Sequence, residues 1–167
     1  MKKIIIAGGS GSIGKKLTNT LIKNGYEVVI LSRNPDKVKN LPKGARAVRW
    51  DARTGADWTE EASGAHAIIN LAGENLAGPG FLPKRWTEAR KKLIQQSRLE
   101  TGNAVVDAVR RASIKPEVVI QSSAVGYYGP RGSEIITEEA GPGTDYLARI
   151  CVEWENSTQA VESLGVR

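Results

Sequence analysis

The sequence predicts an α/β fold built on a doubly wound parallel sheet. Apolar stretches with the length of strands alternate with stretches that have the periodicity of amphipathic helices, which is typical of right-handed β-α-β units. One stretch, at residues 65–71, is apolar enough for a strand buried on both faces, as parallel strands are. A chain of 167 residues fits one domain with a sizeable core, so we expect a single unit over residues 1–167.

The expected elements follow one another along the whole chain. Strands are predicted at residues 4–6, 26–31, 45–50, 65–71 and 117–121. Helices are predicted between the first glycines and Gly25, at residues 36–41, at residues 86–112, and from Thr144 or Asp145 to Gly165. The long helix at 86–112 is basic on one side, and its expected buried stripe consists of Leu93, Ile94, Val105, Val106 and Val109.

A glycine-rich turn joins the first strand to the first helix. Two registers fit: positions 9, 11 and 14 give G-x-G-x-x-G, and positions 8, 11 and 14 give a wider G-x-x-G-x-x-G. Glycine permits positive φ and close approach of a diphosphate, and the free N–H groups of a helix start attract an anion. The residues predicted to hold a dinucleotide diphosphate are therefore Gly8, Gly11, Ser12, Ile13 and Gly14.

The end of the second predicted strand bears on the choice of dinucleotide. In such folds the adenosine ribose lies at this point, where an acidic residue would accept the hydroxyls of NAD. Here the chain has Ser32 and Arg33 and no acid, so we expect Arg33 to bind a 2′-phosphate and NADP(H) to be preferred over NAD(H). The alternative for Arg33 is a solvated loop charge. Asp51, after the third strand, either accepts from the adenine amine or caps a turn.

Small residues follow the fourth and fifth predicted strands as well. Because carboxyl ends of parallel strands share one edge, we expect these residues to approach the same ligand. The residues concerned are Leu71, Ala72, Gly73 and Glu74 after the fourth strand, and Ser122 after the fifth. A loop at residues 75–83, rich in glycine and proline, is expected to cover the site.

The composition limits the other classes of function. The formal net charge of +6 is compatible with a nucleic-acid partner, a cofactor with several phosphates or a missing acidic portion of the chain. Basic residues are dispersed without an aromatic-interleaved stripe, so no nucleic-acid partner is expected. No apolar run approaches the ~20 residues of a membrane span. Cys151, the only cysteine, fits a reducing, cytoplasmic location, and His66 has no Cys or His at ligand spacing, so no metal site is expected.

Six segments together form a specific pattern that covers nearly the whole chain. They are residues 8–14, 50–51, 70–74, 85–98, 121–129 and 146–155. In these segments the chain resembles the extended short-chain dehydrogenases/reductases, the group that includes nucleotide-sugar epimerases. It is most similar to the NAD-dependent epimerase/dehydratase-like branch called epimerase family proteins, some of which are described as cell-division inhibitors.

The resemblance implies a Rossmann-like NADP(H)-binding domain followed by a smaller C-terminal substrate domain. In relatives a sixth strand would begin near Arg167, so we expect this chain to be the N-terminal portion of a longer protein, without the last strand or strands and without the substrate domain. Analogy also suggests a homodimer through the helix at 86–112. The substrate is expected to be a small molecule of unknown identity.

The catalytic part of the resemblance is incomplete. In the superfamily a serine after the fifth strand holds the reacting oxygen, a tyrosine transfers the proton, and a lysine four residues later lowers the tyrosine pKa from ~10. Ser123 matches the serine and Tyr146 lies near the expected spacing, but Ile150 stands where the lysine would be. Arg149 could supply charge, and Tyr127 could line the site. Hydride transfer on a carbonyl or nucleotide-sugar-like substrate is the first interpretation, and a non-catalytic NADP-binding regulatory or interaction protein is the second.

Overall fold

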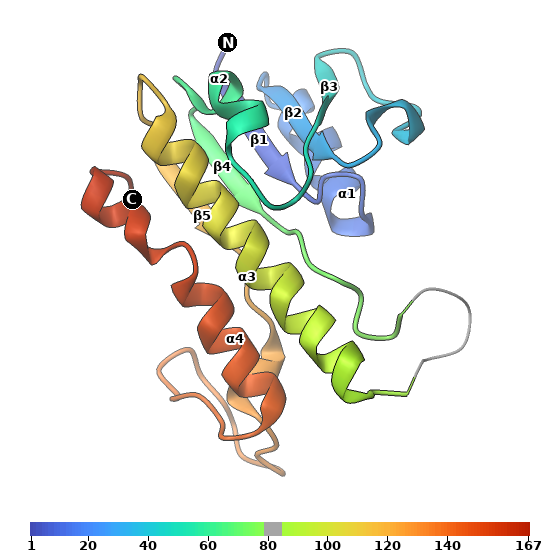
Figure 1. The fold of residues 1–167 in the computed structure, drawn as a ribbon, viewed down its shortest axis with the longest axis vertical. Helices are drawn as coiled ribbons and strands as arrows, with labels where there is room; N and C mark the ends of the chain where they lie inside the picture. Colours follow the sequence, from blue (N-terminus) through green and yellow to red (C-terminus); the bar gives the residue numbers. More distant parts are fainter. Residues whose placement is uncertain (79–84) are drawn as a thin grey trace.

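A five-stranded parallel sheet forms the centre of the structure, a computed structural model that describes residues 1–78 and 85–167 (Figure 1). The strands are β1 (Lys3–Ala7), β2 (Glu27–Ser32), β3 (Ala45–Arg49), β4 (Ala67–Asn70) and β5 (Val118–Gln121). They lie in the order β3-β2-β1-β4-β5, and all four pairings are parallel. The chain thus moves outward from β1 to one edge and then returns to build the other side, which confirms the doubly wound sheet.

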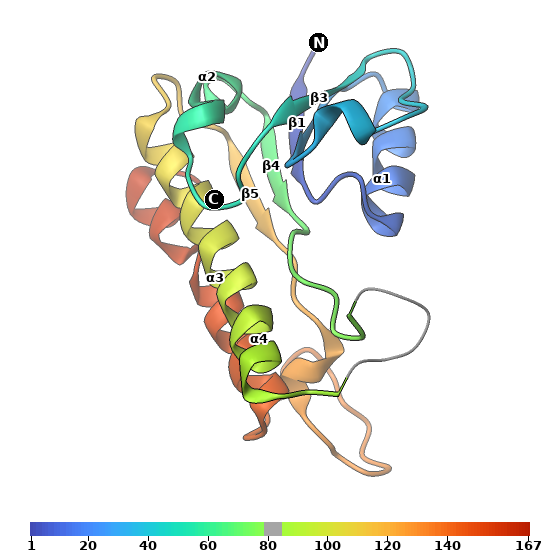
Figure 2. The same ribbon diagram turned by 45° about the vertical axis from the view of Figure 1, so that its right-hand side comes forward.

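Helices cover both faces of this sheet (Figures 1 and 2). The α-helices are α1 (Ser12–Lys23), the short α2 (Thr59–Ala62), α3 (Glu88–Arg111) and α4 (Tyr146–Asn156). α1 lies on one face, whereas α3 lies on the other with α4 running beside it. The side chains of Thr87 and Asp145 cap α3 and α4 by accepting hydrogen bonds from the main-chain N–H groups of Arg90 and Ala148.

The two faces of the sheet form two separate cores because side chains alternate along each strand. On the first face, Ile4 and Ile6 of β1 belong to a cluster against which Leu17 and Leu21 of α1 pack. On the second face, alternate strand residues pack with one stripe of α3; the members include Ile5, Val29, Ile68, Ala104, Val105, Ala108 and Val109. Because both faces are covered, all four residues of β4 are buried, as the apolar run at 65–71 predicts.

Two predicted helices differ from the structure. The helix expected at 36–41 is wrong, because only a 3-10 helix at Pro35–Lys37 forms. Val38 is already extended, Asn40 has a φ of 58°, and Pro42 disfavours helical backbone at the residue before it. The last helix ends at Asn156 and is followed by a 3-10 helix, Gln159–Leu164, which the left-handed Gly165 terminates.

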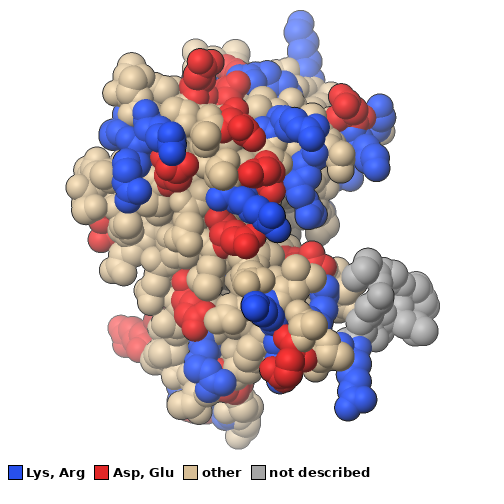
Figure 3. Space-filling view, viewed as in Figure 1, with Lys and Arg blue, Asp and Glu red and all other residues tan. Residues whose placement is uncertain are grey.

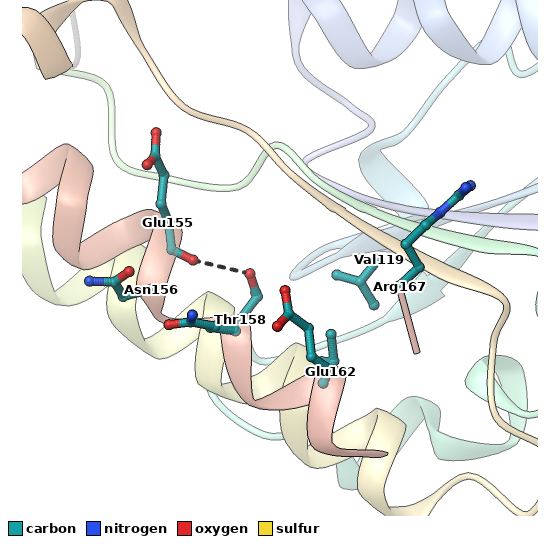
Figure 4. A pocket seen from close by; sticks show the side chains of 8 residues that line it. Val119, Glu155, Asn156, Thr158, Glu162 and Arg167 are labelled. Carbon is teal, nitrogen blue, oxygen red and sulfur yellow. Dashed lines mark hydrogen bonds between the residues drawn. The ribbon is translucent and has the colours of Figure 1, made fainter. Parts of the chain in front are cut away.

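A narrow groove runs beside β5, on the side of that strand away from β4 (Figure 4). The main-chain N–H of Val119 donates to the carbonyl of Arg167 at 2.8 Å, so the chain runs alongside the outer edge of β5 at this point. Glu155 and Glu162 line the groove, and the Thr158 hydroxyl donates to the Glu155 carbonyl at 3.4 Å. Its volume is about 170 Å³, which is small for a ligand site.

Charged side chains of both signs share the surface. On the face shown in Figure 3, lysine and arginine side chains are interspersed with aspartate and glutamate side chains. None of the helices in the described part of the chain combines the length and apolar composition that a bilayer crossing requires.

A glycine in the loop after β3 gives a direct test of the packing between that loop and α3. A Cβ at Gly55 would overlap the main-chain nitrogen of Ala108 and lie 2.7 Å from its Cα. We expect Gly55→Ala to destabilise the chain by about 1–3 kcal/mol or more, because overpacking forces backbone shifts. Urea unfolding should show a lower midpoint for this variant. Gly141→Ala is the matched control, since nothing lies within 4 Å of a Cβ there. Equal midpoints for the two variants would contradict the packing.

Candidate functional site: a cleft at the carboxyl edge of the sheet

A cleft of about 720 Å³ opens where the carboxyl ends of β1, β2, β3 and β4 meet the side of α3. This volume lies within the range of small-molecule and cofactor pockets. The cleft is lined by residues of the glycine-rich turn, of the segments after β2, β3 and β4, and of one side of α3. Nine of the residues predicted to bind a cofactor line it: Gly8, Gly11, Ser32, Arg33, Asp51, Leu71, Ala72, Gly73 and Glu74.

The glycine-rich turn leaves no room for side chains. Gly8 has a φ of 81°, and a Cβ there would lie 2.9 Å from the carbonyl carbon of Leu71. A Cβ at Gly14 would lie 2.5 Å from the Cα of Gly9, and one at Gly9 would lie 2.9 Å from the side chain of Ile30. Both sequence registers therefore have a physical reason, since each of their glycines except Gly11 is pressed against a neighbour.

The N-terminus of α1 is open toward the cleft. Gly11 is the N-cap, and it has no side chain to bond the first N–H groups of the helix. Ser12, Ile13 and Gly14 form this first turn beside the cleft-lining Gly11, and Ile13 is 69% exposed. The helix start thus presents unpaired N–H groups and the positive end of a 12-residue helix dipole, which favour an anion.

The segment after β2 forms a basic end of the cleft. The hydroxyl of Ser32 accepts from the Asn34 N–H at 3.2 Å, which holds the turn. Arg33 and Lys37 both line the cleft, and neither has an ion-pair partner among the described residues. Lys37 is not among the site residues predicted from the sequence, because it falls within the helix expected at 36–41. The signal that could have identified it is its position four residues after Arg33, before the chain enters β3.

Asp51 caps a turn, one of its two predicted roles. Its Oδ1 accepts from the N–H groups of Arg53 and Thr54 at 2.7 and 2.9 Å. Partial burial works against ionisation of this carboxylate, yet these hydrogen bonds outweigh it and lower the pKa of Asp51. Because Asp51 also lines the cleft, its contact with an adenine amine stays a prediction. Arg53 is paired with Glu100 across the cleft mouth at 3.3 Å.

The ends of β4 and β5 are tied together through Asn70. Its buried side chain donates to Gln121 Oε1 at 2.8 Å and accepts from the Ala72 N–H at 3.2 Å. The Asn70 carbonyl accepts from both the N–H and the hydroxyl of Ser122. Ser122, predicted to bind the cofactor, does not line the cleft; its hydroxyl is used to join the two strand ends.

Two arginines of α3 fix the segment after Gly73. Glu74 lines the cleft, but its carboxylate accepts from Arg90 Nη1 at 2.9 Å. Arg98 lies beneath Gly73, where a Cβ would come within 3.3 Å of the arginine Cγ and Cζ. A side chain at Gly73 would therefore press on Arg98, so the close approach predicted here involves this arginine as well as any ligand.

α3 presents one side to the cleft, and this corrects the predicted buried stripe. Leu93 is 48% exposed and lines the cleft, whereas Ile94, Val105, Val106 and Val109 are buried as expected. Leu93 begins a separate row of α3 residues that face the cleft, which continues with Gln96, Ser97, Glu100 and Thr101.

The predicted catalytic residues lie beyond this cleft, around the turn after β5. Ser123 is exposed, and the 3-10 helix Val125–Tyr128 follows it. This turn packs on α4, where a Cβ at Gly126 would be 3.5 Å from Leu147 Cβ and 3.9 Å from Cys151 Sγ. Leu147 and Cys151, one turn apart on α4, are thus the side chains that lie against Gly126. Tyr127 packs edge-to-face with Tyr128.

Tyr146 is directed toward α3. Its hydroxyl donates to the Lys91 carbonyl at 2.7 Å, and its ring packs edge-to-face with Trp86. Burial raises the pKa of the Tyr146 hydroxyl, although the nearby Lys91 opposes this. Lys91 Nζ is 5.4 Å from the centre of the ring. Ile150, in place of the lysine, is buried in the core.

Comparison with known proteins identifies the family of this chain. The model of the NAD dependent epimerase/dehydratase family matches residues 4–164. The chain belongs to this family. Among the family's curated members, the Epimerase family protein SH2119 of Staphylococcus haemolyticus is 34% identical over 168 residues, which is 100% of this chain and 52% of the relative.

Two solved structures of the family support the same assignment. The human epimerase family protein SDR39U1 (isoform 2), solved with NADPH, has a TM-score of 0.75 and 27% identity, and the match covers 94% of this chain and 48% of that one. The nucleoside-diphosphate sugar epimerase of Corynebacterium glutamicum has a TM-score of 0.75 and 30% identity, with 99% and 32% covered. The chain spans about half the length of the curated relatives it matches.

Proposed function

We propose that this chain binds NADP(H) in the cleft, in preference to NAD(H). The observation that carries the proposal is the pair of Arg33 and Lys37 at the end of β2, with no carboxylate paired to either among the described residues. A 2′-phosphate bound there gains charge-assisted hydrogen bonds, whereas a ribose diol would find no cleft-lining acid in this segment, because Asp36 does not line the cleft.

The rest of the cleft suits the other parts of a dinucleotide. The open start of α1 would hold the diphosphate, with the N–H groups of Ser12 and Ile13 as donors. The adenosine would lie between β2 and β3, beside Asp51, and the nicotinamide would reach toward Ala72 and Gly73. The human relative's complex with NADPH supports this choice of cofactor.

For the reaction, we propose hydride transfer on a carbonyl or nucleotide-sugar-like substrate. When bound, the nicotinamide would supply or accept the hydride. The exposed hydroxyl of Ser123 would hold the reacting oxygen, and Tyr146 or Tyr127 would move the proton. For Tyr146 this requires its hydrogen bond to the Lys91 carbonyl to break, which makes Tyr146 a weaker candidate than its spacing suggests. The similarity to a nucleoside-diphosphate sugar epimerase supports the substrate class.

A second function, a non-catalytic NADP-binding regulatory or interaction protein, has a specific observation in its favour. The lysine position holds the buried Ile150, and the Tyr146 hydroxyl is bonded away from the turn that carries Ser123. This arrangement would retain the cofactor site and lack an efficient proton donor. A role in cell division would belong to this class.

The whole protein is proposed to continue into a C-terminal substrate domain, since the relatives are about twice as long as the chain. The edge of β5 where Val119 pairs with Arg167 is the place where a sixth strand would extend the sheet. We also retain a homodimer through α3, a small-molecule substrate and a cytoplasmic location as proposals.

The cofactor preference can be tested by calorimetric titration with NADPH and NADH. We expect NADPH to bind about ten- to a hundredfold more tightly, because charge-assisted hydrogen bonds contribute about 1.5–3 kcal/mol. Arg33→Ala should remove most of this margin, and Lys37→Ala part of it. Lys43→Ala, an exposed lysine before β3 that does not line the cleft, should leave it intact. Equal affinities for the two nucleotides would contradict the proposal.

Ser123→Ala separates the two functions. If the protein catalyses hydride transfer, it should consume NADPH with some member of a panel of carbonyl compounds and nucleotide sugars. The rate of NADPH consumption should fall by about a hundredfold or more in this variant, because one hydrogen-bond donor to the reacting oxygen is lost. Ser163→Ala, an exposed serine of the last 3-10 helix, is the control. Turnover that survives Ser123→Ala would refute the catalytic role of Ser123. Tight NADPH binding without turnover in the unmodified protein would favour the regulatory function.

A further inference from the structure

Arg98 is a half-buried cation that the proposed function does not use. Its guanidinium lies between the segment after β4 and helix α4: Nη1 donates to the carbonyls of Glu74 and Ile94 at 3.2 and 3.0 Å, and Cζ lies 4.9 Å from the centre of the Trp154 ring. These contacts fix the plane of the guanidinium and its position under Gly73.

The hydrogen-bonding capacity of Arg98 is largely unused. A guanidinium has five N–H donors, and among the described residues only Nη1 finds acceptors, both of them neutral carbonyls. Nε and Nη2 have no hydrogen-bond partner among the described residues, and both are accessible to solvent. No carboxylate lies within ion-pair distance of Arg98 in this part of the chain.

Arg90, two turns earlier on α3, differs from Arg98 because it is paired with a carboxylate, although its Nε is buried without a partner among the described residues. Its side chain is 11% exposed, Nη1 pairs with the Glu74 carboxylate at 2.9 Å, and Nη2 donates to the Asn75 carbonyl. The charge of Glu74 also acts on Arg98, but the Glu74 carboxylate is bonded to Arg90. Arg98 therefore keeps an unneutralised positive charge, because an arginine stays protonated in proteins, and its Nε and Nη2 donors are unpaired among the described residues.

Arg98 contacts α4, the helix that also packs on the 3-10 helix after Ser123: its Cζ lies over the ring of Trp154, and Cys151, one turn earlier on α4, packs at Gly126. Arg98 acts electrostatically on Cys151 and Tyr146 of α4, and burial lowers the pKa of its guanidinium while these two groups and Glu74 oppose the shift. Burial likewise raises the pKa of the Cys151 thiol, which Arg98 opposes, so Cys151 stays neutral near pH 7 and does not neutralise the arginine. Cys151 in turn packs on the turn at Gly126.

We infer that Arg98 is the substrate-recognition cation of this protein, and that the substrate carries an oxyanion group, a carboxylate or a phosphate, that binds the unpaired edge of the Arg98 guanidinium. The inference rests on the proposed function, because it takes α4, which contacts both Arg98 and the 3-10 helix after Ser123, to border the substrate. A planar fork backed by Trp154 and two carbonyls is suited to hold two anionic oxygens at once.

The test is an NMR titration of the ¹⁵N-labelled protein saturated with NADP⁺, which also blocks the anion site of the glycine-rich turn. Acetate and inorganic phosphate are the two anionic probes, acetamide is the uncharged analogue of acetate, and chloride keeps the ionic strength constant. The signals followed are the Trp154 indole N–H and the Arg98 Nε–H. We expect saturable shifts with at least one anion and none with acetamide, and the tighter anion identifies the group on the substrate.

Variants decide whether Arg98 is responsible. Arg98→Gln should weaken the apparent Kd, followed at Trp154, by about tenfold or more, and Arg98→Lys should restore part of it, because the charge returns without the fork. Arg110→Gln, an exposed arginine near the other end of α3, should change nothing. If Arg98→Gln does not fold, the anion affinity of Arg98→Lys is compared with that of Arg110→Gln. A weaker affinity in Arg98→Lys supports the inference, and equal affinities overturn it.

Two kinds of failure are distinguishable in the same samples. Equal affinities in Arg98→Gln and Arg110→Gln, equal shifts with acetamide and acetate, or no shift with either anion would overturn the inference. Failure of NADP⁺ to shift the amide signals of Gly11 and Ser12 would instead refute the proposed cofactor function, whatever the anions do at Trp154.

Discussion

The close contact between the glycine-rich turn and the segment after β4 is the constraint on which the cleft depends. Leu71 N–H donates to the Ala7 carbonyl at 2.9 Å, and the next turn of backbone at Gly8 lies so near Leu71 that no side chain fits between them. This contact brings the ends of β1 and β4 together as the floor of the cleft. It also directs the N-terminus of α1 toward the cleft. The same close contact therefore positions both the floor of the cleft and the main-chain N–H groups that can bind an anion.

Charge divides the cleft and its surroundings into two regions with different chemistry. At the β2 end, Arg33 and Lys37 face open space, which suits a phosphate that arrives with the cofactor. At the β4 end, α3 supplies two arginines, of which Arg90 is neutralised by Glu74 and Arg98 is not. Helix α3 therefore has two roles. Its apolar stripe covers the sheet, and its other side carries these arginines and the row of residues that lines the cleft.

The fold and most of the residues that line the strand-end side of the cleft could be predicted from the sequence because they rest on local patterns. Strand-length apolar runs, the glycines at 8, 9, 11 and 14, and the basic end of β2 each have a short-range physical cause. The contacts between α3 and α4 could not be predicted in this way, because they depend on how two helices rotate against each other. The resemblance pointed to Tyr146 through its distance along the sequence from Ser123, whereas Leu147 and Cys151 lie against Gly126 and the Tyr146 hydroxyl bonds to α3. Leu93 was misassigned for the same reason, since an apolar residue beside a buried stripe can equally line a cleft.

The proposed cleft holds dinucleotide phosphates at two positions, the start of α1 and the end of β2. A crystal structure of the protein grown with NADP⁺ tests both positions at once. We expect the diphosphate within hydrogen-bond distance of the main-chain N–H groups at Ser12 and Ile13, and the 2′-phosphate against Arg33 and Lys37. A nucleotide bound with its adenosine away from the end of β2, or bound outside this cleft, would contradict this expectation.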